Sequence, residues 1–61
     1  MSLRKLDLEK CNVANPSPLY YLEYVNEINL KDNLIIDIEE IVQFLRTCNS
    51  LFNLDLRGNP V

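Results

Sequence analysis

Three stretches of the chain share one pattern of four apolar positions and a fifth position that holds Asn or Cys. In each stretch the spacing is apolar-x-x-apolar-x-apolar-x-x-(Asn or Cys)-x-apolar. The three copies are Leu3, Leu6, Leu8, Cys11, Val13; Val25, Ile28, Leu30, Asn33, Ile35; and Leu51, Leu54, Leu56, Asn59, Val61. Because repetition of a pattern along a chain is typical of stacked repeat architectures, we expect one small structural unit to be built three times.

Within each copy, apolar residues alternate with polar ones, which is the period of a strand with one buried face. The alternation is clearest in residues 3–8 and 53–56. Strands this short cannot hold a sheet alone, so we expect about three parallel strands to stack and bury continuous apolar columns. The predicted columns are Leu6, Ile28, Leu54 and Leu8, Leu30, Leu56. The predicted fold class is α/β.

Residues 37–48 are predicted to form the one helix. Asp37 is suited to cap its N-terminus, with Glu40 three residues later, and Arg46 suits the C-terminal end of the helix dipole. The spacing predicts an apolar stripe of Ile38, Ile41, Leu45 and Cys48, with Val42 and Phe44 beside it.

The connection between the first two copies is predicted to be less regular. Pro16 and Pro18 remove two backbone donors, so only a short helical turn over residues 19–24 is expected there. Tyr20, Tyr21 and Tyr24 are expected to pack against the neighbouring repeat, because each combines a large apolar ring with a polar tip.

The bend after each strand leaves backbone groups without partners in the sheet. Asn33 and Asn59 lie at this bend, where an inward-pointing amide can both donate and accept hydrogen bonds. Cys11 takes the equivalent place in the first copy and is expected in the inner column, where its thiol packs well but pairs less completely.

The repeated pattern resembles the leucine-rich repeat family over essentially the whole chain. From Leu3 to Val25 is 22 residues, and Pro16, Leu19 and Leu22 fall at the further core positions of the short intracellular repeats. Such repeats typify regulatory subunits of protein phosphatase 1 and also occur in ciliary and centrosomal proteins. The second spacing, to Leu51, is 26 residues, and the extra ones lie in residues 37–49.

The resemblance implies a leucine-rich repeat solenoid with its helix on the convex side and irregular or 3-10 connections elsewhere. Residues 1–61 then form a single segment with repeats at residues 3–24, 25–50 and, in part, 51–61. Residues 54–61 resemble the last repeat of such an array, and neither end carries a capping unit. Because solenoids need polar end units, we expect a fragment near the C-terminal end of a longer array.

Composition argues against catalysis. The chain has no histidine, only one glycine, and two cysteines outside any Cys-x-x-Cys pair, so the usual general base, phosphate loop and zinc site are all missing. The adjacent Glu39 and Glu40 are interpreted as a solvated helix face. We expect no enzyme activity, no cofactor and no metal.

Composition also indicates a compartment. The sequence shows no signal peptide, no membrane-spanning apolar run and no Asn-x-Ser/Thr acceptor, and Cys11 and Cys48 are not expected to pair. The expected location is intracellular and cytoplasmic, with cilium or centrosome as narrower options. Six basic and nine acidic residues predict neither a nucleic-acid nor a membrane partner.

The remaining candidate is a protein-binding surface on the side of the strands that faces away from the core. The resemblance implies that this is the concave face, which the family uses for partners. The candidate residues are Lys5, Asp7, Glu9, Glu27, Asn29, Lys31, Phe52, Asn53, Asp55 and Arg57. An alternative for part of this set is pairing within the sheet, of Lys5 with Glu27 and of Glu9 with Lys31.

Three functions fit such a surface. The first is a protein–protein interaction scaffold in an intracellular assembly, and the second is a regulatory subunit of a protein phosphatase. The third, less favoured, is a leucine-rich repeat partner of an RNA-binding protein, since the chain lacks a phosphate-binding surface of its own.

Overall fold

Three strands of three residues each form one parallel sheet. In the computed structural model, which describes residues 3–61, these are β1 (Lys5–Asp7), β2 (Glu27–Asn29) and β3 (Asn53–Asp55), and they lie in the order β1-β2-β3. The central residues Leu6, Ile28 and Leu54 align across the sheet without offset. This register confirms the first predicted apolar column and the α/β class.

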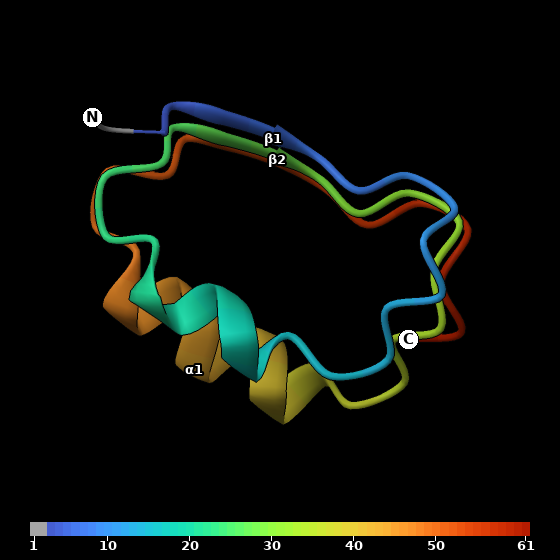
Figure 1. Ribbon diagram of the computed structural model, residues 1–61. Helices are drawn as coiled ribbons and strands as arrows, with labels where there is room; N and C mark the ends of the chain where they lie inside the picture. The colour runs from blue at the N-terminus through green and yellow to red at the C-terminus, as the bar shows by residue number, and fades with distance from the viewer. Residues whose placement is uncertain (1–2) are drawn as a thin grey trace.

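The two connecting segments lie together on the opposite side of the molecule from the sheet (Figure 1). The first contains the 3-10 helix η1 (Ser17–Tyr21) and the second the helix α1 (Ile38–Thr47), and the two are in contact. Apolar side chains fill the space between these segments and the strands. The core is therefore one layer between a sheet face and a helical face.

Local signals determine the ends of α1. The extended backbone of Asp37 places its carboxylate to accept the Glu39 N–H at 2.9 Å, and the Cys48 N–H donates back to the Phe44 carbonyl. A carboxylate near the N-terminus and Arg46 in the last turn both suit the helix dipole. The predicted range 37–48 is confirmed, with its two end residues as caps.

The predicted inward stripe of α1 is partly wrong. Ile41, Phe44 and Cys48 are buried, whereas Leu45 is 46% exposed and Ile38 and Val42 are also exposed. The Phe44 ring stacks on Tyr20 of η1, with ring centroids 6.1 Å apart. Because an aromatic ring buries more apolar area than a leucine, the contact with η1 turns the helix toward Phe44 and leaves Leu45 outside.

The first connection also differs from expectation. Its helical turn begins at Ser17 rather than at residue 19. Proline is tolerated in the first turn of a helix, because backbone N–H groups there have no partner within the helix. Tyr20 is inward, and its hydroxyl donates to the Glu40 carbonyl at 3.0 Å. Tyr21 is 87% exposed and Tyr24 is exposed as well, so the packing role holds only for Tyr20. A helix of five residues has one inward side, and Leu19 and Tyr20 occupy it.

Two asparagines, Asn33 buried and Asn59 partly buried, connect the bends that follow the strands. The Asn33 Oδ1 accepts the N–H groups of Cys11 and Val13 at 3.0 and 2.9 Å, and its Nδ2 donates to the Leu8 carbonyl. Asn59 joins the next pair of bends through the Leu30 carbonyl and the Ile35 N–H. The predicted roles of both amides are confirmed.

Cys11 does not enter the inner column, and its side chain is exposed. Each asparagine bonds to the bend of the preceding strand, and no strand lies outside β1 in the described part of the chain. The Cys11 thiol therefore has no preceding bend to pack on and donates only to the nearby Glu9 carbonyl.

Apart from Pro16, the fully buried apolar side chains all belong to the middle copy. They are Val25, Ile28, Leu30, Ile35, Ile41, Phe44 and Cys48. Of the equivalent leucines in the other two copies, Leu6, Leu8, Leu51, Leu54 and Leu56 pack against this cluster but stay partly exposed, and Leu3 is exposed. The core is centred on β2, the one strand with a neighbour on each side.

Candidate functional site

Outward-facing side chains of the three strands surround a depression of about 370 Å³ over the sheet. Because the strands pair without offset, Lys5, Glu27 and Asn53 form one row across this face, and Asp7, Asn29 and Asp55 form a second. The depression is lined by these six residues together with Leu6 and Ile28. The structure thus brings six of the ten candidate residues to one hollow.

The second row has a structural role that sequence reasoning missed. Asp7, Asn29 and Asp55 each accept, through Oδ1, the backbone N–H two residues further on, at 3.0 Å in every case. This contact closes the turn at the end of each strand, as Asp and Asn side chains commonly do. The signal was present in the sequence as an Asp or Asn at the same position of all three copies.

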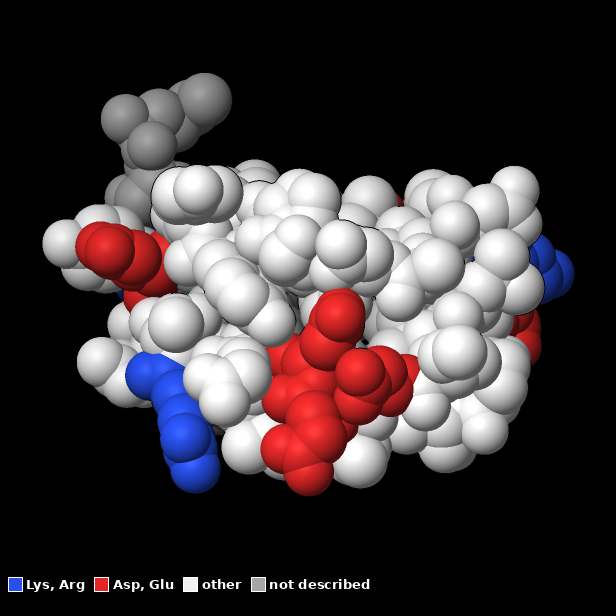
Figure 2. All heavy atoms as spheres, turned by 90° about the horizontal axis from the view of Figure 1, so that it is seen from below, with Lys and Arg blue, Asp and Glu red and all other residues white. Residues whose placement is uncertain are grey.

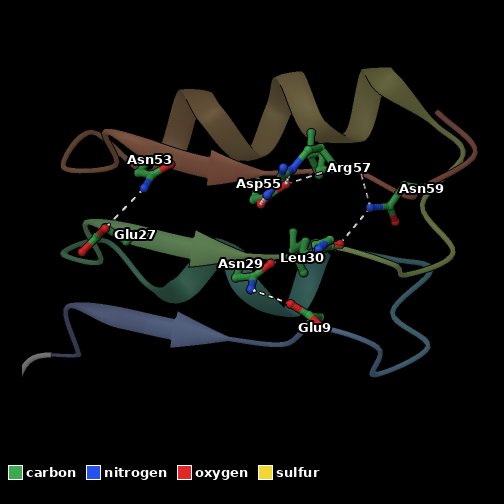
Figure 3. Close-up of polar contacts among 10 residues, drawn as sticks. Glu9, Glu27, Asn29, Leu30, Asn53, Asp55, Arg57 and Asn59 are labelled. Atoms are coloured by element: carbon green, nitrogen blue, oxygen red, sulfur yellow. Dashed lines mark hydrogen bonds and ion pairs between the residues drawn. The ribbon is translucent and has the colours of Figure 1, made fainter.

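Asp55 and Arg57 form the strongest ion pair of this face. The Arg57 Nη2 lies 2.8 Å from the Asp55 Oδ2, and Nε donates to Oδ1 at 3.0 Å (Figure 3). These hydrogen bonds lower the pKa of the Asp55 carboxyl to about 2 and raise the pKa of Arg57. The forked geometry holds Arg57 over the end of β3.

The first row contains the predicted pair of Lys5 and Glu27. Their charged atoms lie 3.2 Å apart, and the Asn53 amide also donates to the Glu27 carboxylate at 3.3 Å (Figure 3). The hydrogen bond from Lys5, and to a smaller extent the one from Asn53, lowers the pKa of the Glu27 carboxyl. This prediction is confirmed, and most of the charge in the row is matched within the sheet.

The predicted pair of Glu9 and Lys31 is wrong. Glu9 instead accepts the Asn29 side-chain amide at 3.2 Å (Figure 3), and the ion pairs of residues 3–61 do not include Lys31. Because Asn29 is held in place by its own turn contact, its amide reaches Glu9 without the entropy cost of ordering a lysine. The Lys31 ammonium, two residues beyond β2, is thus left outside the ion pairs of the described residues.

Phe52 lies apart from the hollow. Its side chain is 75% exposed and is not among the residues that line the depression. It immediately precedes β3, an outer strand of the sheet. Phe52 is therefore a feature of the edge rather than of the face.

The opposite side of the molecule has a different character. Figure 2 shows acidic side chains gathered at the centre of the helical face, among mostly uncharged surface. Asp37, Glu39 and Glu40 lie at the start of α1, where the helix dipole favours negative charge. Residues 3–61 contain no cluster of three side chains suited to bind a metal ion.

The two cysteines have different surroundings, and neither forms a disulfide. Burial raises the pKa of the Cys48 thiol, which donates to the Leu22 carbonyl at 3.5 Å. Cys48 therefore belongs to the core.

Comparisons with protein-family models, curated proteins and solved structures return no match. Among the described residues, α1 falls short of the length and apolar character of a membrane-spanning helix.

Proposed function

We propose that the chain is a protein-binding module of the leucine-rich repeat type, a short solenoid segment that receives its partner on the sheet face. The three-fold pattern, the strands without offset and the asparagine at the bends of the second and third copies support this assignment. The most favoured setting is a scaffold in an intracellular assembly.

The hollow over the sheet is the observation that carries the proposal. Its floor is the backbone of β1 and β2 at Leu6 and Ile28, whose side chains point into the core, and charged and amide side chains stand around it. Fixed polar groups around a hollow orient a bound protein or peptide in this way. The polar groups here are held by turn contacts and ion pairs, so little further ordering is needed on binding.

The partner we propose is a protein segment that presents both an acidic and a basic group. Lys31 lies two residues beyond β2, with its ammonium outside the ion pairs of the described residues, and it suits a carboxylate. Asp7 lines the hollow and Glu9 is at the position after β1 that is equivalent to Lys31, and both carboxylates suit a lysine or arginine. Charge complementarity of this kind contributes mainly orientation and association rate.

Lys31→Glu is the sharpest test, because the Lys31 side chain supports no turn. Asp55→Arg, by contrast, would also remove the turn contact to Arg57. The wild-type chain, Lys31→Glu and the control Arg46→Glu on the helical side would be immobilised and exposed to cell extract, with bound proteins quantified by mass spectrometry. We expect at least one protein to bind to the wild-type chain and to the control in similar amounts, and to bind to Lys31→Glu in an amount at least tenfold lower.

An unchanged set of bound proteins with Lys31→Glu would refute a role for the sheet face. Adding the chain to a protein phosphatase catalytic subunit then separates the two main functions. A scaffold leaves the phosphatase rate unchanged, whereas a regulatory subunit changes that rate in a manner that Lys31→Glu abolishes.

A further inference from the structure

The two outer strands leave matching edges. On β2, the groups that bond toward β3 are the Asn26 carbonyl and the N–H groups of Leu30 and Asp32. The equivalent groups of the third copy are the Phe52 carbonyl and the N–H groups of Leu56 and Gly58. The backbone groups with which β2 and β3 each bond to the strand before them include the N–H of the residue just before the strand and two carbonyls. In the first copy the equivalent groups are the Arg4 N–H and the Asp7 and Glu9 carbonyls, on the outer edge of β1. One edge therefore offers the donors and acceptors that the other needs, at the same spacing.

From this complementarity we propose that the chain associates head to tail with a second copy of itself, β3 of one copy pairing in parallel with β1 of the next. The same lateral step that relates β1 to β2 and β2 to β3 then continues across the junction. This surface is the edge of the sheet, and the proposal does not depend on the function assigned to its face.

The side chains in line across that junction are complementary. Continuing the rows brings Arg57 of one copy next to Glu9 of the second copy, and exposed Phe52 next to Arg4 of the second copy. The first is an ion pair, and the second is an arginine over an aromatic face. Asp55 would meet Asp7 of the second copy, but Arg57 already neutralises Asp55.

Apolar surface is also left uncovered on both sides. Leu54 and Leu56 beside the outer edge of β3, and Leu6 and Leu8 beside that of β1, are only partly buried, whereas Ile28 and Leu30 between them are buried. An added strand would complete both columns. Burial of apolar side chains is the main favourable term in such association.

The helical layer fits the same arrangement. The exposed residues Ile38, Val42 and Leu45 form one flank of α1, and Phe44 on the other flank contacts η1. The segment behind the next β1 would lie two strand spacings from α1, about 10 Å at about 4.8 Å per strand. This matches the usual 8–10 Å or so between packed helices, so η1 of the second copy can cover that flank.

Head-to-tail contacts of this kind do not close on themselves, so the expected product is a series of growing assemblies rather than a dimer alone. Sedimentation velocity of the purified chain over a concentration series is the first measurement. We expect the weight-average mass to rise with concentration through dimer and beyond. A chain that stays monomeric up to millimolar concentration would overturn the proposal.

Charge reversal tests the junction itself. Glu9→Arg and Arg57→Glu each place like charges in line, so each variant alone should associate at least tenfold more weakly. Mixing the two variants, or combining both changes in one chain, restores opposite charges at every junction and should restore association. Glu23→Arg, in the turn before β2, is the matched control and should associate like the wild type.

Circular dichroism and thermal melting of each variant check that the fold is kept. If Arg57→Glu is unfolded because Asp55 loses its partner, Glu9→Arg against wild type still tests the junction. Wild-type association by Glu9→Arg, or failure of the double variant to recover association, would show that a different surface is responsible and would overturn the proposal.

Discussion

The middle copy of the repeat and the two copies beside it carry the same apolar pattern, yet they are buried to different extents. Leu30 is completely buried, whereas Leu8 and Leu56 at the same position of the neighbouring copies are only partly buried. The pattern determines which way each side chain points. A neighbouring strand on both sides determines whether the side chain loses contact with water.

The same contrast holds for the polar residues at the bends. Asn33 is 3% exposed and bonds to the bend of the preceding strand, whereas Cys11 at the equivalent position is exposed. The burial and hydrogen bonding of the side chain at this position therefore depend on the preceding copy and not only on its own. Four predictions test how far this dependence on neighbours extends.

The largest effect is expected in the core. Leu30→Ala should lower the free energy of unfolding by about 2–5 kcal/mol, because the buried site cannot collapse fully around a smaller side chain. Leu8→Ala should cost clearly less, since Leu8 is already in contact with water. Urea unfolding followed by circular dichroism measures both. Equal losses in the two variants would contradict the contrast between middle and outer copies.

The next effect concerns the buried amide. Asn33→Ala leaves the Cys11 and Val13 N–H groups and the Leu8 carbonyl without their partner, and each such group costs about 1–3 kcal/mol where water cannot replace it. Asn59→Ala should cost less, because Asn59 is only partly buried. The two variants would be compared by the same urea titration. A greater loss with Asn59→Ala would refute the ranking.

A smaller effect is expected at the left-handed bend. Lys10, Asp32 and Gly58 all have positive φ at the same position of the three copies, and Gly58 lies at +80°. Gly58→Ala should cost about 1–2 kcal/mol from backbone strain alone, and its Cβ would also overlap the Asp32 carboxylate.

The double variant Asp32→Ala/Gly58→Ala separates these two causes. If strain dominates, the penalty of Gly58→Ala stays the same in the Asp32→Ala background. If the overlap dominates, the penalty shrinks. Thermal melting of the three variants and the wild type gives the comparison.

The smallest effect is a pH dependence from the Asp55 carboxyl. Its pKa in the folded chain is about 2, below the ordinary 3.8, so the carboxyl contributes stability that is present above about pH 4 and is lost as the pH falls toward 2. The lowered pKa of Glu27 acts in the same direction. Because both carboxylates are still partly exposed to solvent, salt should weaken the effect.

Arg57→Gln is the matched variant for this pH dependence. Without the guanidinium, the pKa of Asp55 should return toward its ordinary value, and the loss of stability between pH 4 and pH 2 should become smaller. Melting temperatures at several pH values measure it, and identical pH profiles for the two chains would contradict the assignment.

Much of the fold could be predicted because it depends on spacing along the chain. The strand register follows from equal positions in the three copies, and the ends of α1 follow from Asp37 and the residues around it. The row of Lys5, Glu27 and Asn53 could be predicted for the same reason. Parallel strands without offset place equivalent residues side by side.

The parts that could not be predicted depend on which element packs against which. The sequence cannot tell whether Phe44 or Leu45 faces inward, because both have helical spacing to Ile41 within one residue. Contact with Tyr20 decides in favour of Phe44. Likewise, Glu9 pairs with Asn29 rather than Lys31, because the turn contact of Asn29 fixes that amide first.

The sequence by itself therefore determined the direction of the side chains on the strands, the order and register of the strands, and the ends of the helix, since these follow from local spacing and capping. Only the tertiary structure decided the extent of burial, the orientation of α1 and the partners of the charged groups. The physical reason is that burial and pairing are properties of neighbours. The edges of β1 and β3 remain open in the structure, and their association is the next property to measure.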